Sequence, residues 1–222
     1  MSFTVKTTTE VEEVANFVAS SILKQLNLNK RVLFFVTGGS SIPVCVKISE
    51  VIRKNPHKNL VVTLTDERYG VVGHKDSNYF KLIKSGFSLP QARMIPVLIG
   101  DDLDTTAQKF NFNLNEEFNS AEYKIGLFGV GADGHTAGIL PDSVAINSND
   151  LACSYVTPIF SRITMTPKAI EKLDEAVVFA RGQEKWETLK KLIEEDMDIK
   201  KQPAQILKKV PLLTIFTDYK NI

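Results

Sequence analysis

The sequence predicts an α/β protein in which helices cover both faces of a mostly parallel sheet, a three-layer αβα arrangement. Two patterns favour this fold class. Short apolar runs, typical of strands covered on both faces, alternate with segments whose apolar residues recur at helical spacing. Polar or glycine-rich turns follow several of these runs. The composition agrees, because 222 residues with 43% hydrophobic and 24% charged side chains are ordinary for a single globular domain, here residues 1–222.

The first half of the chain supplies helix and strand candidates in alternation. Thr9 with Glu12 three residues later has the form of a capping box, which predicts a helix over residues 9–26. The continuous apolar run at 32–36 predicts a buried strand. Pro43 suits the first turn of a second helix that extends to about residue 54. A further buried strand at 60–65 leads into a polar loop and a short helix that begins near Asn78.

The second half continues the alternation. We expect strands at 94–99, 124–130, 151–157, 162–166, 176–180 and 212–216, and helices at 104–119, 168–173 and 183–197. Strands alternating with helices imply a Rossmann-like sheet, in which ligands bind at the carboxyl ends of the strands. The polar turns at those ends are therefore the candidate functional segments.

Charge and cysteine content limit the partners. The chain has 27 Lys+Arg against 26 Asp+Glu, a net charge of +1, so we expect no nucleic-acid partner. Cys45 and Cys153 have no ligand spacing, which fits a reducing compartment. No apolar run approaches the roughly 20 residues that span a bilayer, and no secretory signal is visible. We therefore expect a cytoplasmic protein without a membrane partner; the sequence leaves the oligomeric state open.

The loop at residues 37–41, Thr-Gly-Gly-Ser-Ser, is the first candidate site. Glycines between a strand and a helix let backbone N–H groups approach an anion, and the helix N-terminus adds a partial positive charge. Gly38, Gly39 and Ser40 are thus candidate phosphate ligands. A tight turn with Ser40 or Ser41 as helix cap is the equally weighted alternative. The loop lacks the Lys-Ser/Thr pair of a Walker motif.

The second candidate is Asp66-Glu67-Arg68, which follows the strand at 60–65. The planar guanidinium of Arg68 suits a phosphate or an oxyanion. A solvated loop with an internal ion pair is the alternative for such a triplet. His74, a few residues later, is more typical of a residue that caps or orients a loop.

The richest segment is Gly-Val-Gly-Ala-Asp-Gly-His-Thr at 129–136. Its glycine spacing matches a dinucleotide fingerprint, but it lies late in the sheet, Pro141 follows closely, and the next strand does not end in an acid. We therefore reject nucleotide binding. His135 is instead a candidate general base, and Asp133 is placed to orient its ring. A structural histidine is the alternative.

Two cations complete the candidate set. Arg162 opens a strand, and Lys185 lies in the first turn of a helix after Gly182. Each by itself is most often a surface cation. The chain has no HExxH motif or His/Cys cluster, so we expect neither a metal nor another cofactor.

Together, these segments resemble the 6-phosphogluconolactonase family, within the group that includes glucosamine-6-phosphate deaminases. The matching patterns are Asp-Glu-Arg at 66–68 with His74 and Ser-Asn at 77–78, Gly-x-Gly-x-Asp-Gly-His-Thr-Ala-x-x-x-Pro at 129–141, Arg-Ile-Thr-x-Thr at 162–166, and Gly182 with Lys185. They occur in family order. The chain departs from the family at Pro43, which is displaced by one place, in the loop at 69–73, and at Gly138, where Ser is usual.

The resemblance also separates the two branches of the group. Deaminases carry Glu where this chain has Leu140, and Tyr where it has Arg68. Both differences favour the lactonase, which hydrolyses 6-phospho-D-glucono-1,5-lactone in the oxidative pentose phosphate pathway. A deaminase/isomerase and a non-catalytic sugar-phosphate sensor are the alternatives.

The resemblance implies roles for the candidate residues. His135 is the expected general base, Asp133 its orienting acid, and Arg68 the partner of the oxyanion. The substrate and its phosphate are expected to bind Gly38, Gly39, Ser40, Asp66, Arg162 and Lys185.

Overall fold

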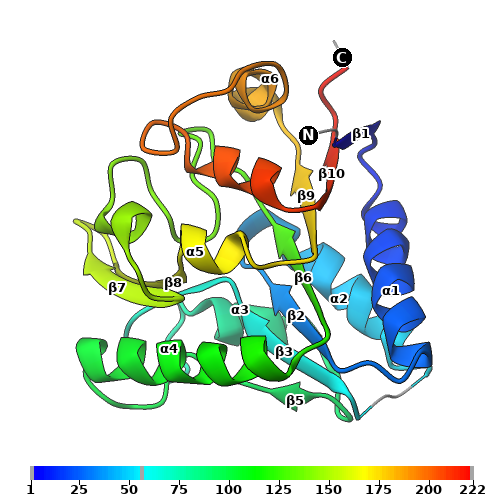
Figure 1. The fold of residues 1–222 in the computed structure, drawn as a ribbon, viewed down its shortest axis with the longest axis vertical. Coiled ribbons are helices and arrows are strands. Elements are labelled where there is room, and N and C mark those ends of the chain that lie inside the picture. Colours follow the sequence, from blue (N-terminus) through cyan, green and yellow to red (C-terminus); the bar gives the residue numbers. More distant parts are fainter. Residues whose placement is uncertain (1–2, 56–57, 221–222) are drawn as a thin grey trace.

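The centre of the computed structural model, which describes residues 3–55 and 58–220, is a parallel β-sheet. Within these residues the sheet has seven strands in the order β1-β10-β9-β6-β2-β3-β5 (Figure 1). Every neighbouring pair in it is parallel. The strands are β1 (Thr4–Thr7), β2 (Val32–Val36), β3 (Leu60–Leu64), β5 (Arg93–Met94), β6 (Tyr123–Phe128), β9 (Glu175–Ala180) and β10 (Leu212–Thr217).

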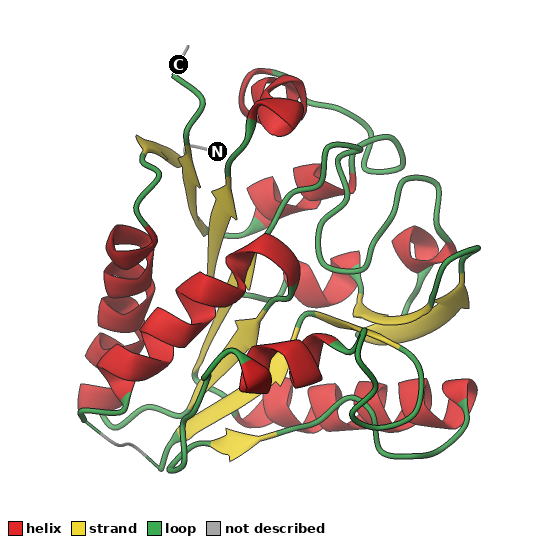
Figure 2. Ribbon diagram, turned by 180° about the vertical axis from the view of Figure 1, so that it is seen from behind, coloured by secondary structure: helices red, strands yellow, loops and turns green. Residues whose placement is uncertain are grey.

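Helices cover both faces of this sheet, which confirms the predicted three-layer fold. One layer holds α1 (Val11–Asn27), α2 (Ile42–Ile52) and α3 (Asn78–Lys84), which lie in front in Figure 2. The other holds α4 (Leu103–Ser120), α5 (Pro167–Ile170) and the 3-10 helix η4 (Pro203–Lys209), which lie in front in Figure 1. The short α6 (Trp186–Glu194) lies near the carboxyl ends of β9 and β10. Within the described residues, no helix has the length and apolarity needed to cross a membrane.

The two helical layers pack on opposite faces of the sheet through aromatic contacts. Phe35 of β2 packs on Phe118 of α4, with ring centroids 5.8 Å apart, whereas Phe17 of α1 packs on Phe216 of β10 at 5.3 Å. Successive strand residues point to opposite faces, so a strand covered on both sides must be apolar throughout. This explains why all five residues of β2 are buried.

A second, antiparallel sheet lies beside the main one, and the sequence did not predict it. It has the order β4-β8-β7 and comprises β4 (Asp66–Arg68), β7 (Ala152–Val156) and β8 (Ser161–Met165). The strands predicted at 151–157 and 162–166 therefore form a hairpin outside the main sheet. The first residues of the predicted polar loop are themselves a strand, because Asp66 to Arg68 pair with β8.

Several predicted boundaries are wrong for identifiable reasons. The strand expected at 94–99 is reduced to Arg93–Met94, since Ile95 makes a last bond to Val62 and Pro96 has no N–H to continue the ladder. Thr9 does not cap α1; Glu10 is the cap residue, and the hydroxyl of Thr8 accepts its N–H at 3.1 Å. The helix expected at 183–197 is divided into η3 (Gln183–Lys185) and α6.

Removing the ring of Phe34, which is fully buried in β2, should destabilise the fold. We expect Phe34→Ala to lower the free energy of unfolding by about 3–5 kcal/mol, because a cavity replaces the ring. Phe112→Ala is the matched control: Phe112 is 64% exposed on α4, and the loss there should stay within about 0.5 kcal/mol. Equal losses in urea titrations of the two variants would contradict the packing described here.

Candidate active site

A pocket of about 290 Å³ opens at the carboxyl ends of the central strands. It lies outside β2 and β6, where the chain order of the sheet reverses, which is the usual ligand position in such sheets. Segments from both sheets line it: residues 37–41, Asp66, Arg68, Asn78, residues 129–131, His135, Ala137, Arg162 and Lys185. Every residue for which the sequence analysis expected a catalytic or binding role is in this lining except Asp133, which contacts His135.

The glycine loop needs both of its glycines. Gly39 has a φ of +64°, which a side chain would strain. A Cβ on Gly38 would lie 2.3 Å from Oδ1 of Asn78, so no side chain fits there. The loop runs through a 3-10 turn directly into α2, whose first turn holds Pro43. The backbone of the loop is thereby presented to the pocket at a helix N-terminus.

His135 is held by Asp133 on the turn after β6. Oδ1 of Asp133 lies 2.5 Å from Nδ1 of the ring and accepts the backbone N–H of His135 at 3.1 Å. The hydrogen bond from His135 lowers the pKa of the Asp133 carboxyl below its ordinary value. A carboxylate at Nδ1 retains the proton on that nitrogen, so Nε2 carries the lone pair of the neutral ring. The pair therefore has the geometry that an oriented general base requires.

Glycines shape the same turn. A Cβ on Gly131 would lie 2.2 Å from the imidazole, and Gly134 has a φ of +86° with Gln202 behind it. The ring thus lies directly over the backbone of Gly131. The family usually has Ser at position 138. Here a side chain at this position would be too close to Thr164, because a Cβ on Gly138 would lie 2.8 Å from Cβ of Thr164.

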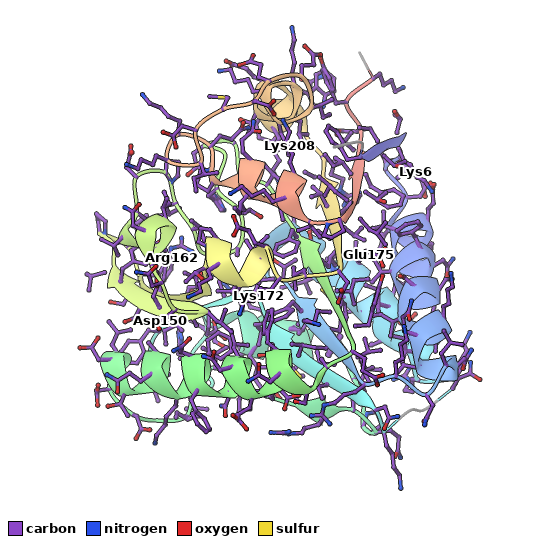
Figure 3. The ribbon with its side chains drawn as sticks, viewed as in Figure 1. Lys6, Asp150, Arg162, Lys172, Glu175 and Lys208 are labelled. Atoms are coloured by element: carbon purple, nitrogen blue, oxygen red, sulfur yellow. The ribbon has the colours of Figure 1, made fainter. Side chains whose placement is uncertain are left out.

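Arg68 and Arg162 are directly opposite each other in the β4–β8 pair. Opposite residues of an antiparallel pair project from the same face, so both guanidinium groups point to the pocket side of the small sheet. Arg68 donates to the carbonyl of Asp76 at 3.2 Å, and Arg162 lies 3.9 Å from Asp66. Figure 3 shows Arg162 at the small sheet, on the other side of the molecule from Glu175. The pair concentrates positive charge in the pocket.

Three buried atoms of the pocket lack a partner within the part of the chain that the structure describes. They are Nε of Arg68, Nε of Arg162 and Oδ1 of Asn78. Buried polar groups are normally hydrogen-bonded, and leaving one unpaired costs about 1–3 kcal/mol. Two donors and one acceptor are therefore available to a polar ligand.

Glu67 faces away from the pocket and fixes the residues around it. Its carboxylate is fully buried and accepts the backbone N–H groups of Arg68, Asn78 and Tyr79 at 2.6–2.9 Å, together with the hydroxyl of Ser77. It therefore binds the first turn of α3 to β4. Burial raises the pKa of Glu67, and the hydrogen bonds partly offset that rise. Sequence analysis did not assign this role, because a charged triplet after a strand gives no sign of which member is buried.

Lys185 enters the pocket from the turn before α6. Asp218 holds both ends of this turn: it accepts the N–H of Gly182 at 3.0 Å and Nε1 of Trp186 at 2.9 Å. His74 has the orienting position expected for it, with Nε2 3.0 Å from the carbonyl of Arg68. Among the described residues, no three His, Cys, Asp or Glu side chains gather as a metal site would require.

Similarity to known proteins shows the family of the chain. The family model described as glucosamine-6-phosphate isomerases/6-phosphogluconolactonase matches residues 6–214. The chain belongs to this family. Two similar family members are the 6-phosphogluconolactonases of Helicobacter pylori, 29% identical over 180 residues, and Borreliella burgdorferi, 28% identical over 170 residues. The alignment with the Helicobacter pylori protein covers 78% of this chain and 77% of that protein. The alignment with the Borreliella burgdorferi protein covers 71% of this chain and 72% of that protein.

Solved structures share the fold of the chain. The 6-phosphogluconolactonase of Thermotoga maritima superimposes with a TM-score of 0.84 at 20% identity, over 97% of this chain and 99% of the other. A monomeric glucosamine-6-phosphate deaminase superimposes with a TM-score of 0.80 at 17% identity, over 97% of each chain. The fold is thus common to both branches of the family, and the distinction between them has to come from individual residues.

The titration of Glu67 gives a prediction for stability. A raised native pKa means that folding favours the protonated acid, so its stabilisation is complete below about pH 4.5 and is lost as pH rises through the native pKa. We expect the free energy of unfolding of the wild type, relative to Glu67→Gln, to fall as pH rises above about 4.5.

Glu187→Gln is the control for this measurement. Lys191 lowers the pKa of the exposed Glu187, so any trend there should have the opposite sign. Urea unfolding at a series of pH values tests both, and a relative stability that rises with pH for Glu67 would contradict the burial argument.

Proposed function

We propose that this protein hydrolyses 6-phospho-D-glucono-1,5-lactone to 6-phosphogluconate in the oxidative pentose phosphate pathway. The observation that carries the proposal is the oriented His135–Asp133 pair in one pocket with Arg68, Arg162 and Lys185. A general base beside concentrated positive charge suits attack of water on an ester whose remote end is a phosphate. The printed names of the relatives agree with this activity.

His135 acts as the general base in the proposed mechanism. Nε2 takes a proton from water as the oxygen attacks C1 of the lactone, and the imidazolium then gives the proton to the ring oxygen as the C1–O bond breaks. Asp133 stabilises the imidazolium and holds the ring in one orientation. The guanidinium of Arg68 hydrogen-bonds the oxyanion that forms on the carbonyl oxygen. No step requires a cofactor, because the lactone carbonyl is already electrophilic.

The phosphate binds in the same pocket in this proposal. The backbone of Gly38 and Gly39, the hydroxyl of Ser40 and the side chains of Arg162 and Lys185 supply its donors. Asp66 accepts from the sugar. Anchoring a remote phosphate orients the reacting carbon, which converts binding energy into rate.

The deaminase reaction is the alternative activity within the family. Its branch carries an acid in place of Leu140, and the leucine side chain has no proton to exchange. Arg68 likewise stands in place of the deaminase tyrosine. Both residues favour the lactonase over the deaminase.

Residues 1–222 are proposed to act as one catalytic domain, since a single apolar core includes helices and strands from both halves of the chain. Cys45 and Cys153 are free thiols, which supports the proposed cytoplasmic location.

A coupled assay tests the activity. Glucose-6-phosphate dehydrogenase generates the lactone, and acid release is measured above the spontaneous rate. We expect rapid acid release and no ammonia from glucosamine 6-phosphate. Ammonia release would identify a deaminase, and binding of 6-phosphogluconate without turnover would identify a sensor.

Loss of the base should affect turnover more than binding. We expect His135→Ala to lower kcat by about 10²- to 10⁴-fold with KM nearly unchanged, because a positioned base contributes about that factor. Steady-state kinetics measures both constants, and a near-normal kcat would remove His135 from the mechanism.

Loss of a phosphate ligand should have the converse effect. We expect Arg162→Ala to raise KM by about 10- to 100-fold, the value of a charge-assisted hydrogen bond, with a smaller change in kcat. Lys109→Ala removes a cation of α4 that is paired with Asp101 outside the pocket, and it should leave KM unchanged. An unchanged KM in Arg162→Ala would refute the anchor assignment.

A further inference from the structure

Asn78 has a position in the pocket that the proposed reaction does not use. It is the first residue of α3, is 1% exposed, and lies between Asp66 and Gly38. Its backbone N–H donates to the buried carboxylate of Glu67 at 2.6 Å, which holds the residue at this point. A polar side chain buried so completely at a ligand pocket requires partners for its amide.

The donor side of the amide is used by Asp66. Nδ2 of Asn78 donates to the backbone carbonyl of Asp66 at 3.0 Å and to its carboxylate Oδ2 at 3.3 Å. Turning the amide over would bring its oxygen against these two acceptors, which is repulsive. Chemistry therefore determines the orientation of the amide: Nδ2 faces Asp66, and Oδ1 faces the glycine loop.

The acceptor side is unused. Oδ1 is buried, and no donor in the described residues reaches it. It points toward Gly38, where a Cβ would lie 2.3 Å away, so the absence of a side chain on Gly38 leaves room for it. The result is a fixed, buried acceptor on the pocket wall beside the phosphate loop.

We propose that Oδ1 of Asn78 accepts a hydrogen bond from one ring hydroxyl of the bound sugar phosphate and so selects substrates that carry this hydroxyl. The pocket is rich in donors, from Arg68, Arg162 and Lys185, and these match the phosphate and carbonyl oxygens. The hydroxyl hydrogens of the sugar instead need acceptors. The carboxylate of Asp66, which accepts from Thr65 at 3.0 Å and from Asn78, serves one sugar hydroxyl in the proposed function, and Oδ1 is the acceptor for another.

The proposal rests on the proposed function for the identity of the sugar, and deoxy analogues test it. The substrates are the parent lactone and its 2-, 3- and 4-deoxy forms. We expect Asn78→Ala to lower kcat/KM for the parent by about 10- to 100-fold, as for loss of a hydrogen bond to a buried acceptor. For the one analogue that lacks the partner hydroxyl, the wild type should already show this loss and the variant should lose nothing more.

A merely structural role for Asn78 predicts a different pattern. The variant would then lose the same factor on all four lactones, and that result would overturn the proposal. Thr65→Val is the matched control: it removes the other side-chain donor to Asp66 but leaves Oδ1 in place, so any loss should be equal on every substrate. Asn78→Ser, whose hydroxyl is too short to reach the same point, replaces Asn78→Ala if thermal unfolding shows the alanine variant to be unfolded.

Calorimetric binding of 6-phosphogluconate and its deoxy analogues separates this proposal from the lactonase assignment. Coupling between Asn78 and one hydroxyl in binding, without turnover, would support the role of Asn78 and reject the lactonase. Normal turnover with no such coupling would reject the role of Asn78 alone. Absence of both binding and turnover would reject both.

Discussion

The pocket depends on one buried carboxylate. Glu67 accepts backbone hydrogen bonds from Arg68 on its own strand and from Asn78 and Tyr79 on α3. These bonds fix the backbone of Arg68, whose side chain lines the pocket, and they hold Asn78 against the glycine loop. Taking a carboxylate out of water is costly unless several hydrogen bonds replace the hydration, and four donors do so here.

Around Glu67, the cations of the pocket and the His135–Asp133 pair come from different segments of the chain. Two arginines and a lysine converge from the small sheet and from the turn before α6. Their charge is only partly balanced, because Asp66 lies 3.9 Å from Arg162. His135 lies on a different turn with its own carboxylate, Asp133, so its imidazole is oriented independently of the cations. This combination of cations with a histidine–carboxylate pair is complementary to an anionic ester that carries hydroxyl groups.

Much of the fold follows from local sequence. The continuous apolar runs of β2 and β3 are buried on both faces as expected, and α4 begins within one residue of its predicted start. One failure has a local cause: the strand expected at 94–99 ends where Pro96 interrupts the ladder. Other failures occur where a distant partner decides. Asp66 to Arg68 are polar and become a strand only because β8 pairs with them. The edge strand β1 was missed because its pairing partner, β10, lies at the other end of the chain.

The sequence by itself determined the αβα fold, the segments that supply the pocket and the pairing of Asp133 with His135, since two residues on a glycine turn are necessarily close. Tertiary structure alone decided that Arg68 and Arg162 are neighbours, that Glu67 is buried while Asp66 faces the pocket, and that Asn78 has an unused acceptor. The physical reason is that hydrogen-bond satisfaction and burial are properties of the packed chain. A residue's partners depend on segments far away in the sequence, which no local pattern specifies.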